Sequence, residues 1–121
     1  MSTVLKQQKL NGKIIFERFN ILLENKYVEY AYADLFAGVL GISQKKLNAV
    51  AKEFTGKTAC QLVEEKIVSV TVELLKQPNL PIQEIAWQLG FEDQYYFSRM
   101  FKKQTGHSPR QYKKLLLTVA K

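Results

Sequence analysis

Cysteine and proline are scarce in this chain of 121 residues, which contains one Cys and three Pro. A single thiol, Cys60, excludes an internal disulfide framework and supplies too few ligands for the usual structural zinc sites. No apolar run approaches the roughly 18 residues that span a bilayer, and residues 1–10 lack the apolar segment of a signal peptide. These absences predict a soluble protein of a reducing, intracellular compartment, with no membrane partner.

Polar side chains that could carry out catalysis together are also lacking. Cys60 and His107 are formally a nucleophile and a base, but nothing supplies an orienting acid or an oxyanion hole. We expect Cys60 to be a small buried hydrophobic residue near Ile67, and Glu64-Glu65 to be a solvated surface pair. The sequence therefore predicts no enzyme, no catalytic residue, no cofactor and no metal.

Positive charge is the first positive feature of the chain, whose formal net charge is +7. It is concentrated in residues 81–121, which contain seven basic and three acidic residues. Such asymmetry favours a polyanionic partner, with nucleic acid ahead of an anionic membrane surface.

Hydrophobic periodicity predicts an all-α fold. In residues 10–24, the positions of Ile15, Phe19, Leu22 and Leu23 share one face of a helix, and no stretch alternates as a strand would. Short helical segments follow, separated by four glycines and a proline-rich stretch, at Gly41, Gly56, 78–81, Gly90 and Gly106.

One pattern of residues occurs twice. Residues 36–41 match residues 85–90 at an offset of 49, each being an apolar-Ala pair followed by Leu-Gly. Further matches follow at an offset of 50, which pairs Leu47 with Phe97, Lys52 with Lys102, Thr55-Gly56 with Thr105-Gly106, and Gln61 with Gln111. One extra residue in the second turn explains the change of offset.

Each copy has the pattern of a helix, a tight turn with glycine and a second helix, which is typical of a helix-turn-helix unit. We expect Ser43 and Asp93 to cap the second helices, and Thr58-Ala59 and Ser108-Pro109 to start the helices that follow. Gly56 and Gly106 suit the left-handed residue that ends a helix.

The second helix of each copy is predicted to bury one side and expose the other. The inward residues are predicted to be Leu47, Val50, Ala51 and Phe54 in the first copy and Phe97, Met100, Phe101 and Gln104 in the second. The outward residues are predicted to be Lys45, Asn48, Ala49 and Lys52 in the first copy and Tyr95, Ser98, Arg99 and Lys102 in the second.

A linker helix is predicted between the copies because residues 59–77 are apolar on two sides. One stripe contains Val63, Ile67, Val70 and Leu74, and the other contains Val68, Val72 and Leu75. Its length of about 28 Å is close to the roughly 34 Å between successive major grooves on one face of DNA. We expect residues 1–29 to form an N-terminal helix packed on the first unit and residues 30–57 to form the first helix-turn-helix. Residues 58–78 are expected to form the linker helix, and residues 79–121 the second helix-turn-helix with a C-terminal helix.

Residues 81–103, PIQEIAWQLGFEDQYYFSRMFKK, and residues 106–112, GHSPRQY, resemble the motif of the AraC/XylS family. The resemblance extends from about Tyr30 to Tyr112, more loosely in its first half, where Ala49 and Ala51 replace the arginine and the larger apolar residue that are common there. It implies two homeodomain-like helix-turn-helix subdomains whose recognition helices enter adjacent major grooves, in a bacterial transcription regulator that often contacts RNA polymerase.

The resemblance also implies roles for individual residues. Base contacts would fall on Lys45, Asn48 and Ala49 in the first unit, and on Gln94, Tyr95, Tyr96 and Arg99 in the second. Lys52 and Lys102 would contact phosphates. Ala49 has no hydrogen-bond donor, so the first unit is expected to position the protein more than it selects the sequence.

Several of these residues have a second interpretation. Arg99 can donate two parallel hydrogen bonds to guanine. Alternatively, it contacts a phosphate or forms an ion pair with Glu92 or Asp93. Gln94 is the better candidate for reading adenine. Asn48 either reads adenine or makes no contact with a base. Tyr96 is expected to pack against a neighbouring helix. Helical spacing predicts core positions, rather than a stacking surface for single strands, for Trp87, Phe91, Phe97 and Phe101.

The sequence therefore predicts sequence-specific binding to the major groove of double-stranded DNA. The alternative is a helical protein-interaction module that contacts RNA polymerase or another regulator and has weak DNA readout. The family usually couples this module to an effector or dimerisation domain that is absent here. We expect the module alone to be monomeric, a full-length protein to dimerise through that domain, and the location to be the bacterial cytoplasm, at the nucleoid when bound.

Overall fold

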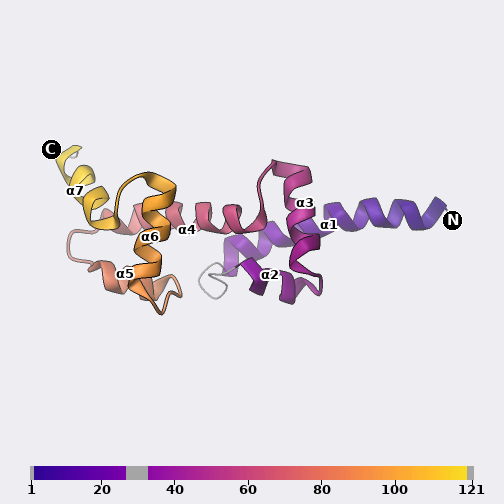
Figure 1. Ribbon diagram of the computed structural model, residues 1–121, viewed down its shortest axis with the longest axis horizontal. Helices are drawn as coiled ribbons and strands as arrows, with labels where there is room; N and C mark the ends of the chain where they lie inside the picture. The colour runs from indigo at the N-terminus through magenta and orange to yellow at the C-terminus, as the bar shows by residue number, and fades with distance from the viewer. Residues whose placement is uncertain (1, 27–32, 120–121) are drawn as a thin grey trace. The chain divides into compact units, whose positions relative to one another are not determined.

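A computed structural model describes residues 2–26 and 33–119, with side-chain burial for 12–25 and 35–118. Within these ranges the chain forms seven helices, and no residue lies in a β-strand, which confirms the all-α prediction. The helices, labelled in Figure 1, are α1 (Ser2–Lys26), α2 (Ala33–Leu40), α3 (Gln44–Thr55), α4 (Ala59–Leu75), α5 (Ile82–Gln88), α6 (Gln94–Thr105) and α7 (Pro109–Val119). None of these helices is both long enough and apolar enough to cross a membrane.

The chain divides into two compact units, Met1–Val63 and Glu64–Lys121. The division falls inside α4, so α4 contributes its first turns to the first unit and the remainder to the second. The predicted boundary between residues 29 and 30 lies outside the described residues.

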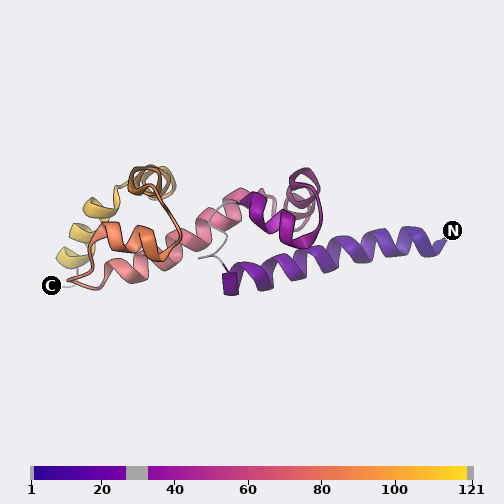
Figure 2. The same ribbon diagram turned by 90° about the horizontal axis from the view of Figure 1, so that it is seen from below.

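In the first unit, α2 and α3 both pack against α1 and lie on the same side of it (Figure 2). Phe19 of α1 meets Phe36 of α2 edge to face, with ring centroids 5.4 Å apart, and both side chains are fully buried. The rest of this core is apolar and comprises Leu23, Ala37, Leu47, Val50, Ala51, Ala59 and Val63. Burying these side chains stabilises the unit by about 25 cal/mol for each Å² of apolar surface removed from water.

In the second unit, the core contains aromatic rings from the turn before α6, from α6 itself and from α7. Phe91 and Phe97 have ring centroids 5.3 Å apart, and Phe101 meets Tyr112 edge to face at 5.4 Å. Aliphatic residues of α4, of α5 and of the C-cap that ends α5 complete the core, which includes Ile67, Leu75, Ile85, Ala86 and Leu89. Phe91, Phe97 and Phe101 are therefore core residues, as predicted.

The buried side of α4 differs in detail from the two stripes predicted for the linker. Its buried residues recur every four positions, at Ala59, Val63, Ile67, Thr71 and Leu75. Thr71 was absent from the prediction because its hydroxyl makes it polar. That hydroxyl donates to the Ile67 carbonyl at 2.7 Å, which removes the cost of burying it.

The turns of the two helix-turn-helix units have the same hydrogen bonds. The amides of Gly41 and Ile42 donate to the carbonyls of Gly38 and Ala37, and those of Gly90 and Phe91 donate to Trp87 and Ala86. This is the Schellman pattern, whose central residue needs a left-handed backbone. Gly41 and Gly90 supply it, with φ of 72° and 83°. Because the turns agree up to Ile42 and Phe91, the extra residue of the second copy is Glu92.

The predicted helix caps are confirmed. The side chains of Ser43 and Asp93 accept hydrogen bonds from Lys46 N–H and Tyr95 N–H, at 3.0 and 2.8 Å. The αL residues Gly56 and Gly106 end α3 and α6.

Each of the following helices, α4 and α7, begins with a reciprocal capping box. Thr58 and Gln61 exchange bonds of 2.9 and 3.1 Å, and Ser108 and Gln111 exchange bonds of 3.1 and 3.2 Å.

Candidate nucleic-acid interface

The helix α6 presents opposite faces to the core and to solvent, as predicted. Phe97, Met100 and Phe101 are buried. The outer face of α6, which we define as Tyr95, Arg99 and Lys102, is exposed, and Tyr95 reaches 74% exposure. Positions i, i+4 and i+7 lie above one another on a helix, so these three side chains form one continuous stripe. The stripe combines a planar guanidinium, an ammonium and an aromatic ring.

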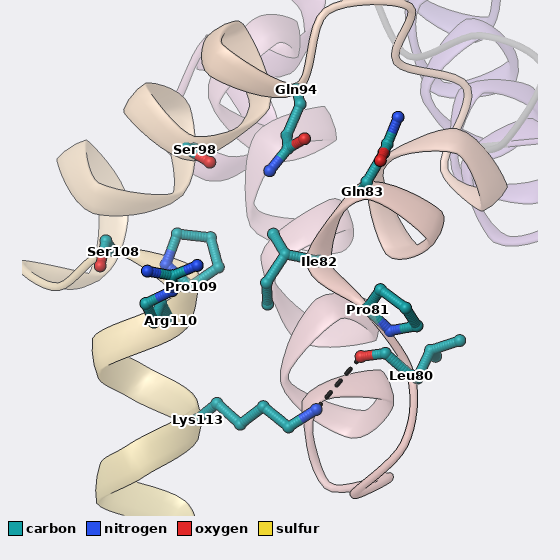
Figure 3. Close-up of a pocket in the computed structure, with 10 residues that line it drawn as sticks. All are labelled: Leu80, Pro81, Ile82, Gln83, Gln94, Ser98, Ser108, Pro109, Arg110 and Lys113. Carbon is teal, nitrogen blue, oxygen red and sulfur yellow. Dashed lines mark hydrogen bonds between the residues drawn. The ribbon is translucent and has the colours of Figure 1, made fainter.

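Two further residues of α6 lie beside the outer face and line a pocket of about 500 Å³. These are Gln94 and Ser98, both partly exposed. Gln94 extends from the first turn of α6 toward Ile82 of α5 (Figure 3). Ser108, Pro109 and Arg110 at the start of α7 also line the pocket, across from Ile82 of α5 (Figure 3).

Lys113 holds α7 to the loop that follows α4. Its ammonium donates to the carbonyls of Gln77 and Leu80 at 3.0 and 3.1 Å, and the second of these bonds is drawn in Figure 3. Both acceptors lie in the loop after Leu75, the last residue of α4, so Lys113 ties α7 to the backbone of this loop. These two bonds fix the wall of the pocket that contains Lys113, and Arg110 is the exposed cation of the lining.

The two adjacent tyrosines of α6 differ in their surroundings. Tyr96 is 39% exposed and its ring centroid lies 6.0 Å from that of Phe91, so the ring packs over the turn, as expected for Tyr96. Tyr95 projects from the outer face of α6 instead. Of the two, Tyr95 is therefore the one whose ring is available to a ligand.

The outer face of α3, which we define as Lys45, Ala49 and Lys52, is also exposed. It occupies the positions aligned with the outer face of α6 at the offset of 50. Its chemistry is simpler, because two ammonium groups flank a methyl group and no side chain can donate two hydrogen bonds in one plane.

Asn48 lies apart from the outer face of α3. Its side chain is partly buried, and its amide oxygen accepts a hydrogen bond of 3.0 Å from the backbone N–H of Ala59, the first residue of α4. Asn48 was predicted to face outward with Lys45 and Ala49. The sequence contained one sign of this contact. Ala59 aligns with Pro109, which has no N–H, so only the first unit has a backbone donor at this position that needs an acceptor.

Two predicted inward positions at the end of the recognition helices are more exposed than expected. Phe54 is 45% exposed, although its ring stacks on Phe16 of α1. Gln104, at the aligned position, is exposed and its amide nitrogen donates to the carboxylate of Glu64. Both side chains therefore make contacts at the margin of the core.

Two other predictions of burial were wrong. Trp87 is 61% exposed, because the core side of α5 is formed by Ile85, Ala86 and Leu89. Trp87 follows Ala86 by about 100° around the helix and points to solvent. Cys60 is exposed for the same reason, since the buried neighbours on α4 are Ala59 and Val63.

Comparison with known proteins agrees with this geometry. A family model described as a helix-turn-helix domain matches residues 36–115. An uncharacterized HTH-type transcriptional regulator of Pseudoalteromonas carrageenovora is 30% identical over 111 residues, covering 90% of this chain and 64% of that protein. The chain spans less than two thirds of the length of the curated relatives it matches.

Solved structures show the same fold. The C-terminal domain of AraT, a response regulator from Geobacillus stearothermophilus, has a TM-score of 0.75, 30% identity and 84% coverage of both chains. A transcriptional regulator with an AraC-type DNA-binding domain from Chromobacterium violaceum has a TM-score of 0.69 and 21% identity, covering 87% of this chain and 94% of that one.

Proposed function

The chain belongs to the AraC family of helix-turn-helix DNA-binding domains, and we propose that it regulates bacterial transcription by reading a specific site in the major groove of double-stranded DNA. Sequence-specific DNA binding is the activity of this family, which is not a family of enzymes. The observation that carries the proposal is the exposed stripe of Tyr95, Arg99 and Lys102, set on a helix whose opposite side is fixed in the core.

In this proposal α6 is the main sequence reader. The guanidinium of Arg99 can donate two parallel hydrogen bonds to O6 and N7 of guanine, and the Gln94 amide can pair with adenine. Tyr95 contacts a thymine methyl or a phosphate, and Lys102, one turn further along, neutralises a phosphate. Tyr96 supports the turn through Phe91.

The recognition helix α3 binds the same duplex and contributes more affinity than selectivity. Lys45 donates a hydrogen bond to a base edge or neutralises a phosphate, Lys52 neutralises a phosphate, and the Ala49 methyl contacts thymine. Because phosphate contacts contain no direct sequence information, the half-site under α3 is expected to be the less defined of the two.

The partners and location follow from this function. One chain binds one asymmetric site as a monomer, and a full-length protein that includes a dimerisation domain pairs two such modules. The protein acts in the cytoplasm, at the nucleoid.

Contact with RNA polymerase is a second proposed role. The exposed Trp87 favours it, because tryptophan is enriched in protein interfaces and this side chain is 61% exposed on α5.

Selection of binding sites from random duplex DNA tests the main proposal. We expect a recurrent motif, and an affinity for it that exceeds the affinity for a scrambled duplex by about 10³-fold or more. Equal binding of all duplexes would reduce the function to non-specific binding. Absence of DNA binding together with binding of RNA polymerase would favour the protein-interaction module.

A further inference from the structure

Asn48 links the recognition helix α3 to the start of α4. The two residues that it joins, Asn48 and Ala59, are 11 positions apart, and the bond of 3.0 Å runs from the Ala59 N–H to the amide oxygen. Asn48 is partly buried and Ala59 is fully buried. The contact is therefore sheltered from water at its donor end.

The first turn of α4 has a specific need for this acceptor. The N–H groups in the first turn of a helix have no acceptor within the helix. The capping box satisfies the amides of Thr58 and Gln61. Ala59 lies between them, and its buried N–H is satisfied by Asn48. Without Asn48, a buried backbone donor would lose its partner.

The second unit meets the same need differently. At the offset of 50, Asn48 aligns with Ser98 and Ala59 aligns with Pro109. The start of α7 has the same capping box, from Ser108 and Gln111, but Pro109 has no N–H and needs no acceptor. Ser98 and Pro109 line one pocket (Figure 3), so the aligned positions are near one another there also. The pairs Asn48/Ala59 and Ser98/Pro109 are alternative solutions to one problem.

We propose that Asn48 is a positioning residue, which fixes α3 against the start of α4 and does not itself read a base. Bidentate recognition of adenine needs the amide oxygen and nitrogen of asparagine to face the base edge together. In this structure the oxygen faces Ala59 instead. The inference rests on the proposed function in one respect, since it assigns the reading of DNA by α3 to Lys45, Ala49 and Lys52 alone.

A pair of substitutions separates positioning from base reading. Asn48→Ala leaves the Ala59 N–H without an acceptor. Ala59→Pro in the same chain removes that N–H and places proline at the first position of α4, where it is well tolerated. We expect Asn48→Ala to lower the ratio of folded to unfolded first unit about tenfold in urea titrations, and the double variant to recover most of that loss. The Ala59 amide proton of Asn48→Ala should exchange with solvent at least about tenfold faster than in the parent chain.

Binding measurements complete the experiment. On the selected duplex and its single-base variants, Asn48→Ala should weaken binding to all sequences by a similar factor, and Ala59→Pro should restore it. A change in preference at one base pair that persists in the double variant would overturn the proposal, because it would identify Asn48 as a base reader. If the chain bound no specific DNA, the proposed function would fail while the unfolding and exchange results would still test the role of Asn48.

The second unit supplies the matched control. Pro109→Ala creates a backbone N–H at the position aligned with Ala59. Ser98→Asn in the same chain then supplies an amide acceptor at the position aligned with Asn48. We expect Pro109→Ala to destabilise the second unit and Ser98→Asn to rescue it. Failure of both rescues, in the first and in the second unit, would contradict the pairing even if Asn48→Ala did not fold.

Discussion

The rings of Phe16 in α1 and Phe54 in α3 lie stacked, with centroids 4.8 Å apart and planes only 6° from parallel. This contact joins the last turn of the recognition helix to the N-terminal helix. At the aligned position of the second unit, Gln104 bonds to Glu64 of α4 instead. In the first unit, α1 therefore supports α3 at the end opposite to the Ser43 cap.

Substitution of Phe54 tests how much this support is worth. Phe54→Ala should lower the free energy of unfolding by about 1–2 kcal/mol, less than a fully buried phenylalanine would, because the ring is half exposed. Urea unfolding followed by circular dichroism measures the change. Ile21→Ala is the control, since Ile21 is 61% exposed on α1 and its loss should change stability by less than about 0.5 kcal/mol. Equal effects of the two substitutions would deny the stack a structural role.

Two neighbouring glycines should respond to alanine in opposite directions. Gly38 lies within α2 and Gly41 has φ of 72°, and a Cβ added to either meets no atom within 4 Å. Gly38→Ala should stabilise the first unit by about 0.5–1 kcal/mol through helix propensity. Gly41→Ala should destabilise it by about 1–2 kcal/mol through backbone strain. Thermal unfolding of both variants checks the signs, and a stable Gly41→Ala would show that the turn tolerates another conformation.

The repeat made much of the fold predictable. Matches such as Gln61 with Gln111 have a local physical cause, because each glutamine closes a capping box at the same place in its unit. The same holds for Gly41 and Gly90, whose left-handed backbone ends the first helix of each unit. Local hydrogen bonds of this kind are set by residues three to five positions apart, which a sequence displays directly.

The errors concern contacts that helical periodicity does not determine. Trp87 was assigned to the core by helical spacing, yet Ile85, Ala86 and Leu89 complete the inner side of the short helix α5. The role of Asn48 depends on Ala59, which a turn carries back to it from beyond the end of α3. Amide side chains fit both DNA bases and buried N–H groups, so residue type alone could not decide between them.

Arg99 is the residue whose loss should change sequence preference most. Arg99→Ala should cost about 1–3 kcal/mol in affinity for the selected duplex and relax the preference at one or two base pairs. Lys102→Ala, on the same face of α6, should weaken binding to all sequences similarly and reduce the salt dependence. Fluorescence anisotropy titrations against single-base variants measure both. If Arg99→Ala lost equal affinity for specific and scrambled duplexes, Arg99 would be a phosphate contact.

The two half-sites should differ in information content. Because Ala49 offers no donor, the selected motif should be better defined under Gln94 and Arg99 than under Lys45 and Lys52. Ala49→Arg places a guanidinium at the position aligned with Arg99 and should add preference for a guanine in the half-site under α3. Parallel selections with the parent and variant chains test this. A sharper half-site under α3 in the parent chain would reverse the assignment of the main reader.

Footprinting of the selected duplex, combined with the mass of the complex, tests the central claim most directly. We expect one chain on each duplex, protection of two adjacent major-groove segments in an asymmetric site, and weaker protection under α6 in Arg99→Ala. Affinity should fall linearly on a logarithmic salt scale, with a slope of about −0.9 for each neutralised phosphate. A complex that requires two chains on a palindrome, or protection of a single groove segment, would contradict the account.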